Sequence, residues 1–218
     1  VSCSSSNKTD SPFDASSPGS DIASEICWLG YEKSAITHMN QPQTILGIDP
    51  ALGTTGYGLI RCTGNVIELV DAGIIRCRRD RPLEDRLGEL FDGLCEILEE
   101  LKPDHFAIEQ LYSHYNRPTT AILMGHARGV ILLAAQRASV VVHSYPATHI
   151  KKTLTGNGRA PKSQMQFAVK QQLALTAIPE PADVADALAI ALTHHNTLRT
   201  PESLLSQFAQ ATFTQLKL

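Results

Sequence analysis

Residues 44–58 read TILGIDPALGTTGYG and contain one acid, Asp49. We interpret the segments that follow as elements that hold the carboxylate of Asp49 in place. The first five residues are mostly apolar and β-branched, and Asp-Pro and a glycine-rich segment halt them. This pattern predicts a buried strand that ends in a carboxylate. An alternative is that Asp49 only starts a turn before Pro50, the common role of an isolated Asp-Pro pair. A second strand that ends in an acid favours the first interpretation.

Hydrophobic periodicity after this stretch predicts an α/β domain. Residues 56–62 and 66–75 alternate in the manner of strands and are joined by a turn, which gives an antiparallel meander of three strands. Residues 83–101 carry leucines at helical spacing with acids on the other face, so a helix follows the meander. Residues 104–109, DHFAIE, predict another short strand, which again ends in an acid, Glu109.

A long helix and one more strand are predicted next. Residues 118–135 form a helix in which Ala121, Gly125 and Gly129 create a small-residue face. We expect this face to pack on the sheet or on a second subunit. Residues 139–145, SVVVHSY, predict a buried strand.

The remaining elements are helices. Two polar helices are predicted around residues 150–152 and over residues 162–175, and a nearly all-apolar helix over residues 182–198. Asp183 and Asp186 are the only charged groups in the first turns of the last helix, and they face the same way. Helix capping and the helix dipole explain such acids in general. Because two strand ends and this helix present acids to a shared sheet edge, we instead expect four carboxylates to converge.

Four converging carboxylates predict a divalent metal site. Two carboxylates 4 Å apart repel by about 4 kcal/mol at an effective dielectric near 20, so the cluster needs protonation or a cation. Hard, all-oxygen ligands favour Mg²⁺, with Mn²⁺ as a substitute. Two such ions per subunit, beside a basic surface, suit phosphodiester hydrolysis, in which one ion activates water and the other stabilises the leaving oxygen.

The composition indicates one domain plus extra sequence. The 218 residues are 43% hydrophobic and 19% charged, which suits a substantial core. The longest apolar runs, such as residues 187–192, are far shorter than the roughly 20 residues that a membrane span needs, so we expect no membrane association. The five cysteines are odd in number and contain no CxxC pair. We therefore expect neither a disulfide framework nor a zinc site, and a cytoplasmic location.

Charge is unevenly distributed along the chain, although the net charge is only −3. Of the 22 acidic residues, 18 lie between residues 10 and 109, and none lies between residues 110 and 179. That acid-free segment suggests a polyanionic partner attracted by the local field. The alternative is a solvated basic surface. Its basic residues are Arg117, Arg128, Arg137, Lys151, Lys152, Arg159, Lys162 and Lys170.

Residues 1–43 differ from the rest of the chain, because serines crowd the first twenty positions and no apolar periodicity is present. We expect this leader to be disordered. It has no apolar segment for secretion, and its acids argue against an organelle transit peptide. Met39 precedes the first strand, so an alternative is that the leader reflects a start site assigned too far upstream. The domain is expected over residues 44–198, followed by a C-terminal tail over 199–218.

Five segments together resemble one known family, in the same order: GIDPALGTTGYG, FAIEQLY, GHARGV, THIKKTLTGNGRAPKSQMQ and ADVADALAIALTHH. They are similar to the RuvC family of Holliday junction resolvases over roughly residues 44–195. The resemblance implies a ribonuclease H-like fold, in which helices flank a mixed five-stranded sheet. It also implies a homodimer that makes paired, Mg²⁺-dependent nicks in opposing strands of four-way DNA junctions. Such a protein works in recombination and repair, alongside the RuvA and RuvB branch-migration proteins.

The resemblance and the basic segment together imply roles for nine residues. Two positions depart from the family pattern, since Ala51 stands where Gly is usual and Tyr112 where Phe is more common. The implied metal-binding and catalytic acids are Asp49, Glu109, Asp183 and Asp186. The implied DNA contacts are Lys151, Lys162 and the stacking aromatic Tyr112, to which the basic segment adds Lys152 and Arg159.

Two other classes of protein fit parts of the sequence. GIDPALGTTGYG also resembles the phosphate loop of actin-like and sugar-kinase ATPases, but that fold needs two lobes, and 218 residues are too few for it. A DNA-binding module without catalysis needs only the basic segment. The presence of all four acids argues against such a module.

The histidines receive no catalytic role from this reasoning. We expect His143 and His149 to be structural or to contact DNA. His194 and His195 come at the end of the last predicted helix, where a favourable interaction with the helix dipole explains them.

Overall fold

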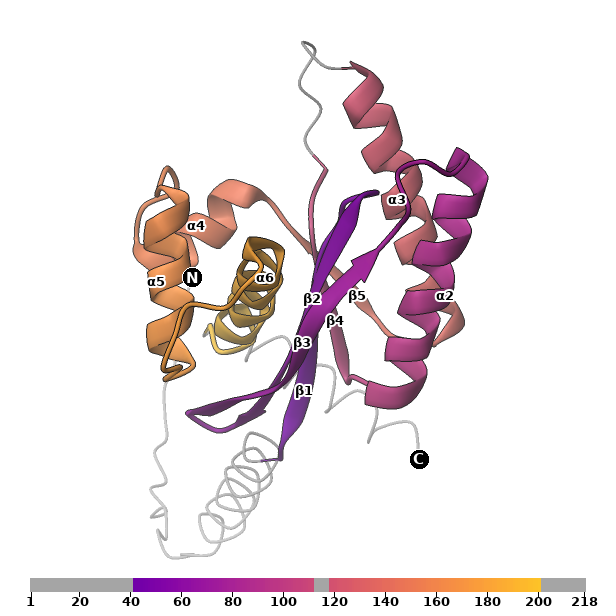
Figure 1. Ribbon diagram of the computed structural model, residues 1–218. Helices are drawn as coiled ribbons and strands as arrows, with labels where there is room; N and C mark the ends of the chain where they lie inside the picture. The colour runs from indigo at the N-terminus through magenta and orange to yellow at the C-terminus, as the bar shows by residue number, and fades with distance from the viewer. Residues whose placement is uncertain (1–40, 112–117, 201–218) are drawn as a thin grey trace, which may run out of the picture. The chain divides into compact units, whose positions relative to one another are not determined.

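The computed structural model describes residues 41–111 and 118–200 of the chain (Figure 1). Within these residues, five strands form one mixed sheet in the order β3-β2-β1-β4-β5. The first three strands pair antiparallel, whereas β4 pairs parallel with both β1 and β5. The predicted α/β fold, with an antiparallel meander followed by parallel strands, is confirmed. The strands are β1 (Gln43–Asp49), β2 (Thr54–Thr63), β3 (Val66–Arg76), β4 (His105–Glu109) and β5 (Val142–Tyr145).

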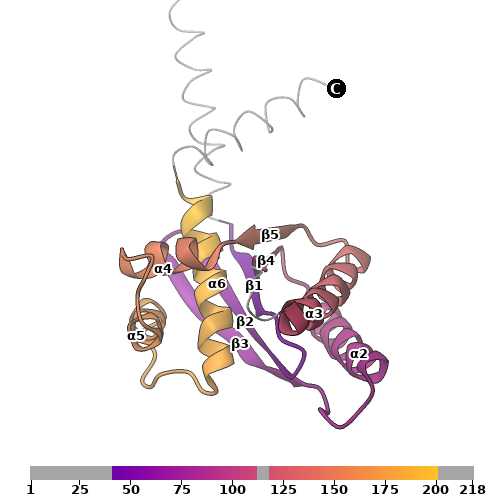
Figure 2. The same ribbon diagram turned by 90° about the horizontal axis from the view of Figure 1, so that it is seen from above.

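Helices cover both faces of this sheet. One face is covered by α2 (Leu83–Leu101) and α3 (Pro118–Arg137), as seen from the side in Figure 1 and from above in Figure 2. The opposite face is covered by α4 (Ala147–Thr155), α5 (Lys162–Gln172) and α6 (Ala182–Leu198).

None of the helices in the described parts of the chain is long and apolar enough to cross a membrane.

Side-chain alternation along the strands sends two of the predicted acids to the same face. Ile48 of β1 is buried in the core under α2 and α3, whereas Ile45 is buried in the core under α4, α5 and α6. Asp49 lies an even number of residues from Ile45, and Glu109 lies two residues from Ala107, which belongs to the same core as Ile45. Because alternate residues of a strand share a face, both acids lie on the α6 side of the sheet.

Two glycines let α6 lie directly against the sheet. A Cβ atom added to Gly47 of β1 would be 2.1 Å from the backbone oxygen of Ala187, and one added to Gly56 of β2 would be 2.1 Å from that of Asp183. No other residue type fits at this separation. Gly56 pairs with Asp49 across the β1–β2 ladder. The close approach therefore places the first turn of α6 beside the end of β1.

Strand β5 is shorter and less buried than the sequence predicts. Residues 139–145 suggest one buried strand, but only Val142–Tyr145 pairs with β4, and all four of these residues are half-buried. Ser139 has a φ of 58°, so the chain is still turning after α3 at this point. The strand also forms the edge of the sheet, which explains why three consecutive valines do not indicate a central strand here.

The small-residue face of α3 does not pack on the sheet, contrary to one of the two predicted alternatives. The buried residues of α3 include Ala127 and Ile131, which belong to the core shared with α2. A Cβ atom added to Gly129 would meet no described atom within 4 Å, and one added to Gly125 would meet only Leu111, at 3.9 Å. A side chain there has free space, so packing on the sheet does not explain the glycines.

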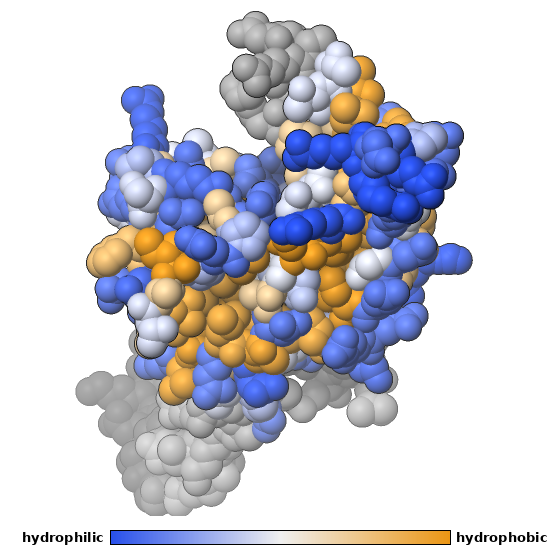
Figure 3. Space-filling view, viewed as in Figure 1, coloured by the Kyte–Doolittle hydropathy of each residue, from blue (hydrophilic) through white to orange (hydrophobic). Residues whose placement is uncertain are grey.

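The outer strand β3 leaves apolar side chains on the surface. Val66, Leu69 and Val70 are 58%, 37% and 38% exposed. Figure 3 shows hydrophobic surface gathered over the part of the molecule where β3 runs. This surface belongs to the β3 edge of the sheet, two strands away from the strand that carries Asp49.

Candidate active site

The ends of β1 and β4 and the beginning of α6 surround a pocket of about 270 Å³. β1 and β4 are parallel neighbours, paired up to the residues that precede Asp49 and Glu109, so the two acids leave the sheet side by side. Five apolar residues of α4, α5 and α6 complete the walls. The structure brings together three predicted acids and two predicted lysines around this pocket: Asp49, Glu109, Asp186, Lys151 and Lys162.

Burial and the neighbouring acids raise the affinity of Asp49 and Glu109 for protons. The pKa of Asp49 rises from 3.8 to about 7, chiefly because burial disfavours its charged form, and further because Asp186, Glu109 and Asp183 are negative. Burial and the charge of Asp186 also raise the pKa of Glu109, while Lys151 acts in the opposite direction. The pocket is therefore a place where negative charge is concentrated and poorly hydrated.

Asp183, the fourth predicted acid, stands beside the pocket. It is half-buried at the first turn of α6, against Gly56, and its charge contributes to the raised pKa of Asp49. The alternative that this acid caps the helix is not supported, since the N-cap residue of α6 is Pro181 and no side chain makes a capping hydrogen bond there. Asp183 is thus an electrostatic member of the acid group without such a capping role.

Lys162 reaches into the acid group from the first residue of α5. Its Nζ donates a hydrogen bond to Oδ2 of Asp186 at 2.7 Å, and the same atoms form an ion pair. The acids raise the pKa of Lys162, with the hydrogen bond to Asp186 as the largest cause. Lys162 therefore carries its positive charge at neutral pH while it offsets part of the negative charge of the pocket.

The other predicted DNA contacts lie outside the pocket or outside the described residues. Lys152 is exposed on α4, one residue beyond the pocket-lining Lys151, and Arg159 is exposed in the turn before α5. Figure 3 shows hydrophilic surface over α4, whereas part of α5 carries hydrophobic surface. Tyr112 falls in residues 112–117, which the structure does not describe.

Arg128 of α3 is a residue that sequence reasoning left among the general basic residues. Its guanidinium donates one hydrogen bond to the backbone carbonyl of Glu109 and another, of 2.9 Å, to Oγ of Ser144 in β5. It therefore ties the ends of β4 and β5 together directly behind the acid group. A single half-buried arginine in a long helix carries no sequence signal for this role, because the contact depends on how α3 crosses the strands.

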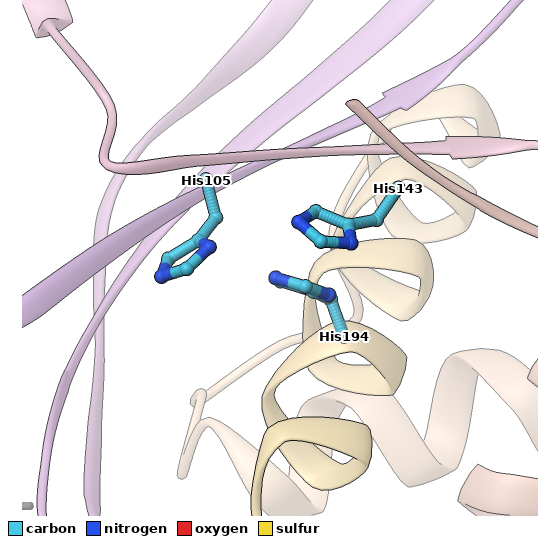
Figure 4. A group of neighbouring side chains, drawn as sticks. All are labelled: His105, His143 and His194. Atoms are coloured by element: carbon cyan, nitrogen blue, oxygen red, sulfur yellow. The ribbon is translucent and has the colours of Figure 1, made fainter. Parts of the chain in front are cut away.

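Three histidines meet at a second place between α6 and the sheet, which the sequence analysis missed. Figure 4 shows the rings of His105, His143 and His194 turned toward one another. Burial and the neighbouring histidines lower the pKa of His194 to about 3, so this imidazole is neutral. His195 also has a lowered pKa. The expectation that His194 acts through the helix dipole is wrong, because that interaction requires a charged imidazolium.

The acid group has the donor set of a site for a hard divalent cation. It offers only carboxylate oxygens, the ligands that Mg²⁺ and Mn²⁺ prefer. No three of the four carboxylates have oxygens that all lie within 4.8 Å of one another, as expected from their mutual repulsion. A cation that offsets this repulsion matches the charge of the pocket, so the residues present fit the predicted ion.

Comparison with solved structures identifies the class of protein that this fold and site define. A structure described as Thermus thermophilus RuvC in complex with Holliday junction substrate superposes with a TM-score of 0.68 at 30% identity, covering 72% of this chain and 95% of that one. The yeast mitochondrial Holliday junction resolvase has a TM-score of 0.54 at 12% identity, which shows the fold alone. The chain is a ribonuclease H-like α/β protein with an acid group at the carboxyl ends of its central strands.

The chain belongs to the RuvC family of crossover junction endodeoxyribonucleases. The model of that family matches residues 45–194. The RuvC protein of Rhodopirellula baltica is 57% identical over 157 residues, which is 72% of this chain and 88% of the relative. That of Desulforamulus reducens is 45% identical over 150 residues, or 69% and 91% of the two chains. The resemblance inferred from the sequence is confirmed.

Proposed function

We propose that this protein resolves four-way DNA junctions by hydrolysing one phosphodiester bond in each of two opposing strands. The observation that carries the proposal is the pocket in which Asp49, Glu109 and Asp186 face Lys151 and Lys162. Family membership supports the same reaction, since the matching relatives are named crossover junction endodeoxyribonucleases.

In this proposal, Asp49, Glu109, Asp183 and Asp186 hold Mg²⁺, with Mn²⁺ as a substitute and two ions per subunit. When bound, the ions supply the positive charge that activates the attacking water and stabilises the leaving oxygen. The chain's own residues set up this chemistry. Burial and clustering keep the carboxylates poorly hydrated, which increases the gain from binding a cation.

The lysines of the pocket have a different task, which is to bind the DNA backbone. Lys162 carries a positive charge at neutral pH, and Lys151 lines the same pocket. These ammonium groups beside the acids would reduce the repulsion between an approaching phosphate and the carboxylates. Lys152, Arg159 and Tyr112 extend the proposed DNA-binding surface, with Tyr112 stacking on a base at the junction.

Paired nicks require two active sites, so we propose a homodimer. The described part of α3 leaves Ile122 and Leu133 61% and 53% exposed, and the glycine face of this helix has free space. An apolar helix surface of this kind is expected to be covered by a second subunit.

We further propose that the protein cooperates with the RuvA and RuvB branch-migration proteins. We also propose a cytoplasmic location, which is consistent with the free thiols of Cys62, Cys77 and Cys95.

The proposed reaction is tested with a synthetic mobile four-way junction incubated with protein and Mg²⁺, mapping nicks on each strand. We expect symmetric nicks in opposing strands, and no cleavage by the matched Asp49→Asn variant. Nicks confined to one strand, or equal cleavage of linear duplex DNA, would mean that the protein is a general nuclease instead.

A further inference from the structure

A group of three imidazoles lies on the same side of the sheet as the acids but at the other end of the same elements. His105 begins β4, the strand that Glu109 ends, which separates the two residues by about 13 Å along the strand. His194 follows Asp186 by eight residues on α6, which corresponds to about 12 Å along the helix. The histidine group is therefore a separate place from the acid pocket.

The three histidines come from three different elements that the fold brings together. His143 of β5 pairs with Ala107 of β4, so its side chain leaves the sheet on the same face as that of His105. Ring centroids are 4.9 Å apart for His105 and His194, 4.2 Å for His143 and His194, and 5.9 Å for His105 and His143. One ring nitrogen from each histidine lies within 4.8 Å of the other two (Figure 4).

His194 has a buried nitrogen that none of the described protein groups satisfies. The residue is 1% exposed, and its Nε2 makes no hydrogen bond to residues 41–111 or 118–200. The other ring nitrogen, Nδ1, is 2.6 Å from the hydroxyl oxygen of Tyr145. A buried polar atom without a partner destabilises the folded protein, and a ligand on this nitrogen would remove that cost. Burial lowers the pKa of all three imidazoles, which leaves their lone pairs free to coordinate.

We propose that His105, His143 and His194 bind one divalent transition-metal ion of the Zn²⁺ class, with water as a further ligand. Three imidazoles suit Zn²⁺, Co²⁺, Ni²⁺ or Cu²⁺, whereas Mg²⁺ prefers oxygen. Small rotations of His105 and His143, which are only half-buried, bring their nitrogens to the roughly 2.0–2.1 Å that Zn²⁺ requires. The site lies outside the proposed reaction and needs none of the acids.

Tyr145 supplies the outer contact that such sites usually have. With Nε2 of His194 on the ion, its Nδ1–H donates to the Tyr145 hydroxyl, which fixes the tautomer and the ring orientation. Tyr145 pairs with Glu109 across the β4–β5 ladder. An ion at the histidines therefore fastens β4, β5 and α6 to one another, the elements that carry Glu109 and Asp186. We assign the ion a structural role that holds these elements in place.

The competing explanation is a packed group of neutral imidazoles that binds no ion. Two measurements on metal-stripped, full-length protein in excess Mg²⁺ distinguish these explanations. The first is a calorimetric titration with Zn²⁺, and the second is the melting temperature with and without Zn²⁺. Co²⁺ in place of Zn²⁺ reports imidazole coordination through its visible absorption bands. The same titrations on Asp49→Asn exclude the acid pocket as the place of binding, since that variant lacks one of its carboxylates.

The variants His105→Gln and His143→Gln remove one ligand each from half-buried positions, and His149→Gln is the matched control. His149 is exposed and stacks on Tyr145 at a centroid distance of 5.7 Å, but it does not belong to the three. Tyr145→Phe tests the outer contact and is expected to weaken Zn²⁺ binding by about tenfold.

We expect one Zn²⁺ per chain and, at a hundredfold excess over the dissociation constant, a melting temperature about 5 °C higher or more. His149→Gln and Asp49→Asn should retain this behaviour, and the two ligand variants should lose at least tenfold in affinity. Absence of Zn²⁺ binding by the parent protein overturns the proposal. Equal binding by His105→Gln and His143→Gln also overturns it, because the cysteines or the acids then hold the ion.

Discussion

Nζ of Lys162 lies 2.7 Å from Oδ2 of Asp186, so a residue expected to bind DNA is in direct contact with a residue expected to bind metal. The two come from different helices, α5 and α6, and meet at the wall of the acid pocket. In the proposed reaction, a DNA phosphate would compete with Asp186 for the ammonium of Lys162, and a bound cation would compete with that ammonium for Asp186.

The first prediction concerns this lysine. Lys162→Met should weaken junction binding and lower the slope of log affinity against log salt by about 1, since each phosphate contact on duplex DNA releases roughly 0.9 counterion. Cleavage in Mg²⁺ should fall more than binding does. The control is Lys152→Met on the neighbouring exposed helix surface, which should change the salt slope without a comparable loss of cleavage. An unchanged slope in Lys162→Met would mean that the lysine serves only the ion pair with Asp186.

The second prediction uses the pKa of Asp49. This pKa is 3.8 in the unfolded chain and about 7 in the folded protein, so between these values the folded protein binds the extra proton. Without metal, the stability contribution of Asp49 is present below pH 3.8 and is lost as pH rises through 7, by at most about 1.4 kcal/mol per pH unit. Asp49→Asn removes this dependence, because its amide does not titrate.

Urea unfolding in metal-free buffer measures the difference between the two proteins. Asp49→Asn should match the parent near pH 4 and be more stable above pH 7, by up to about 4 kcal/mol. Titrating groups outside the pocket, such as His194, affect both proteins and cancel in the difference. A difference in stability that does not vary with pH would show that Asp49 titrates normally.

The third prediction concerns Arg128, which holds the ends of β4 and β5 from α3. Arg128→Lys keeps the charge, but a single ammonium does not span the carbonyl of Glu109 and the hydroxyl of Ser144. Cleavage should fall by about tenfold while junction binding stays within twofold, since the guanidinium positions Glu109 and is already engaged by protein groups. Arg137→Lys, at the exposed end of the same helix, is the control. Equal losses in both variants would assign the effect to α3 in general.

The fold and the place of the acid pocket were predictable from the sequence because they rest on local patterns. Each strand that ends in an acid is indicated by a short run with apolar residues followed by a break, as at Asp49 and Glu109. The near-apolar helix that carries Asp183 and Asp186 is equally plain. These elements share one sheet edge because parallel strands place their carboxyl ends together.

What was not predictable depends on tertiary contacts. Nothing local in the sequence shows that His105, His143 and His194 meet, because they are separated by 38 and 51 residues and come from three elements. The same holds for Arg128, whose partners lie on two strands. The role of Gly47 and Gly56 is readable only once α6 is known to cross β1 and β2. The edge position of β5, which shortens the valine-rich strand, likewise follows from the strand order and not from composition.

The fourth prediction concerns the proposed domain boundaries. We propose that residues 44–198 fold as the nuclease domain and that residues 1–38 lie outside it. A protein that starts at Met39 should then have the same melting temperature within about 2 °C and the same cleavage rate, since it keeps every residue of both cores. Differential scanning calorimetry and the junction assay check this. A large loss of melting temperature would show that the leader packs on the domain.

Whether four acids form one metal site is tested most directly by comparing how four amide variants bind and cleave a four-way junction. The variants are Asp49→Asn, Glu109→Gln, Asp183→Asn and Asp186→Asn. Each amide keeps the size of the acid but removes the charge that binds Mg²⁺. We predict that all four variants fold, bind the junction at least as tightly as the parent in metal-free buffer, and cleave it slower by orders of magnitude in Mg²⁺. If any one of them cleaves at near the parental rate, that acid does not bind metal, and the four-acid site is contradicted at that position.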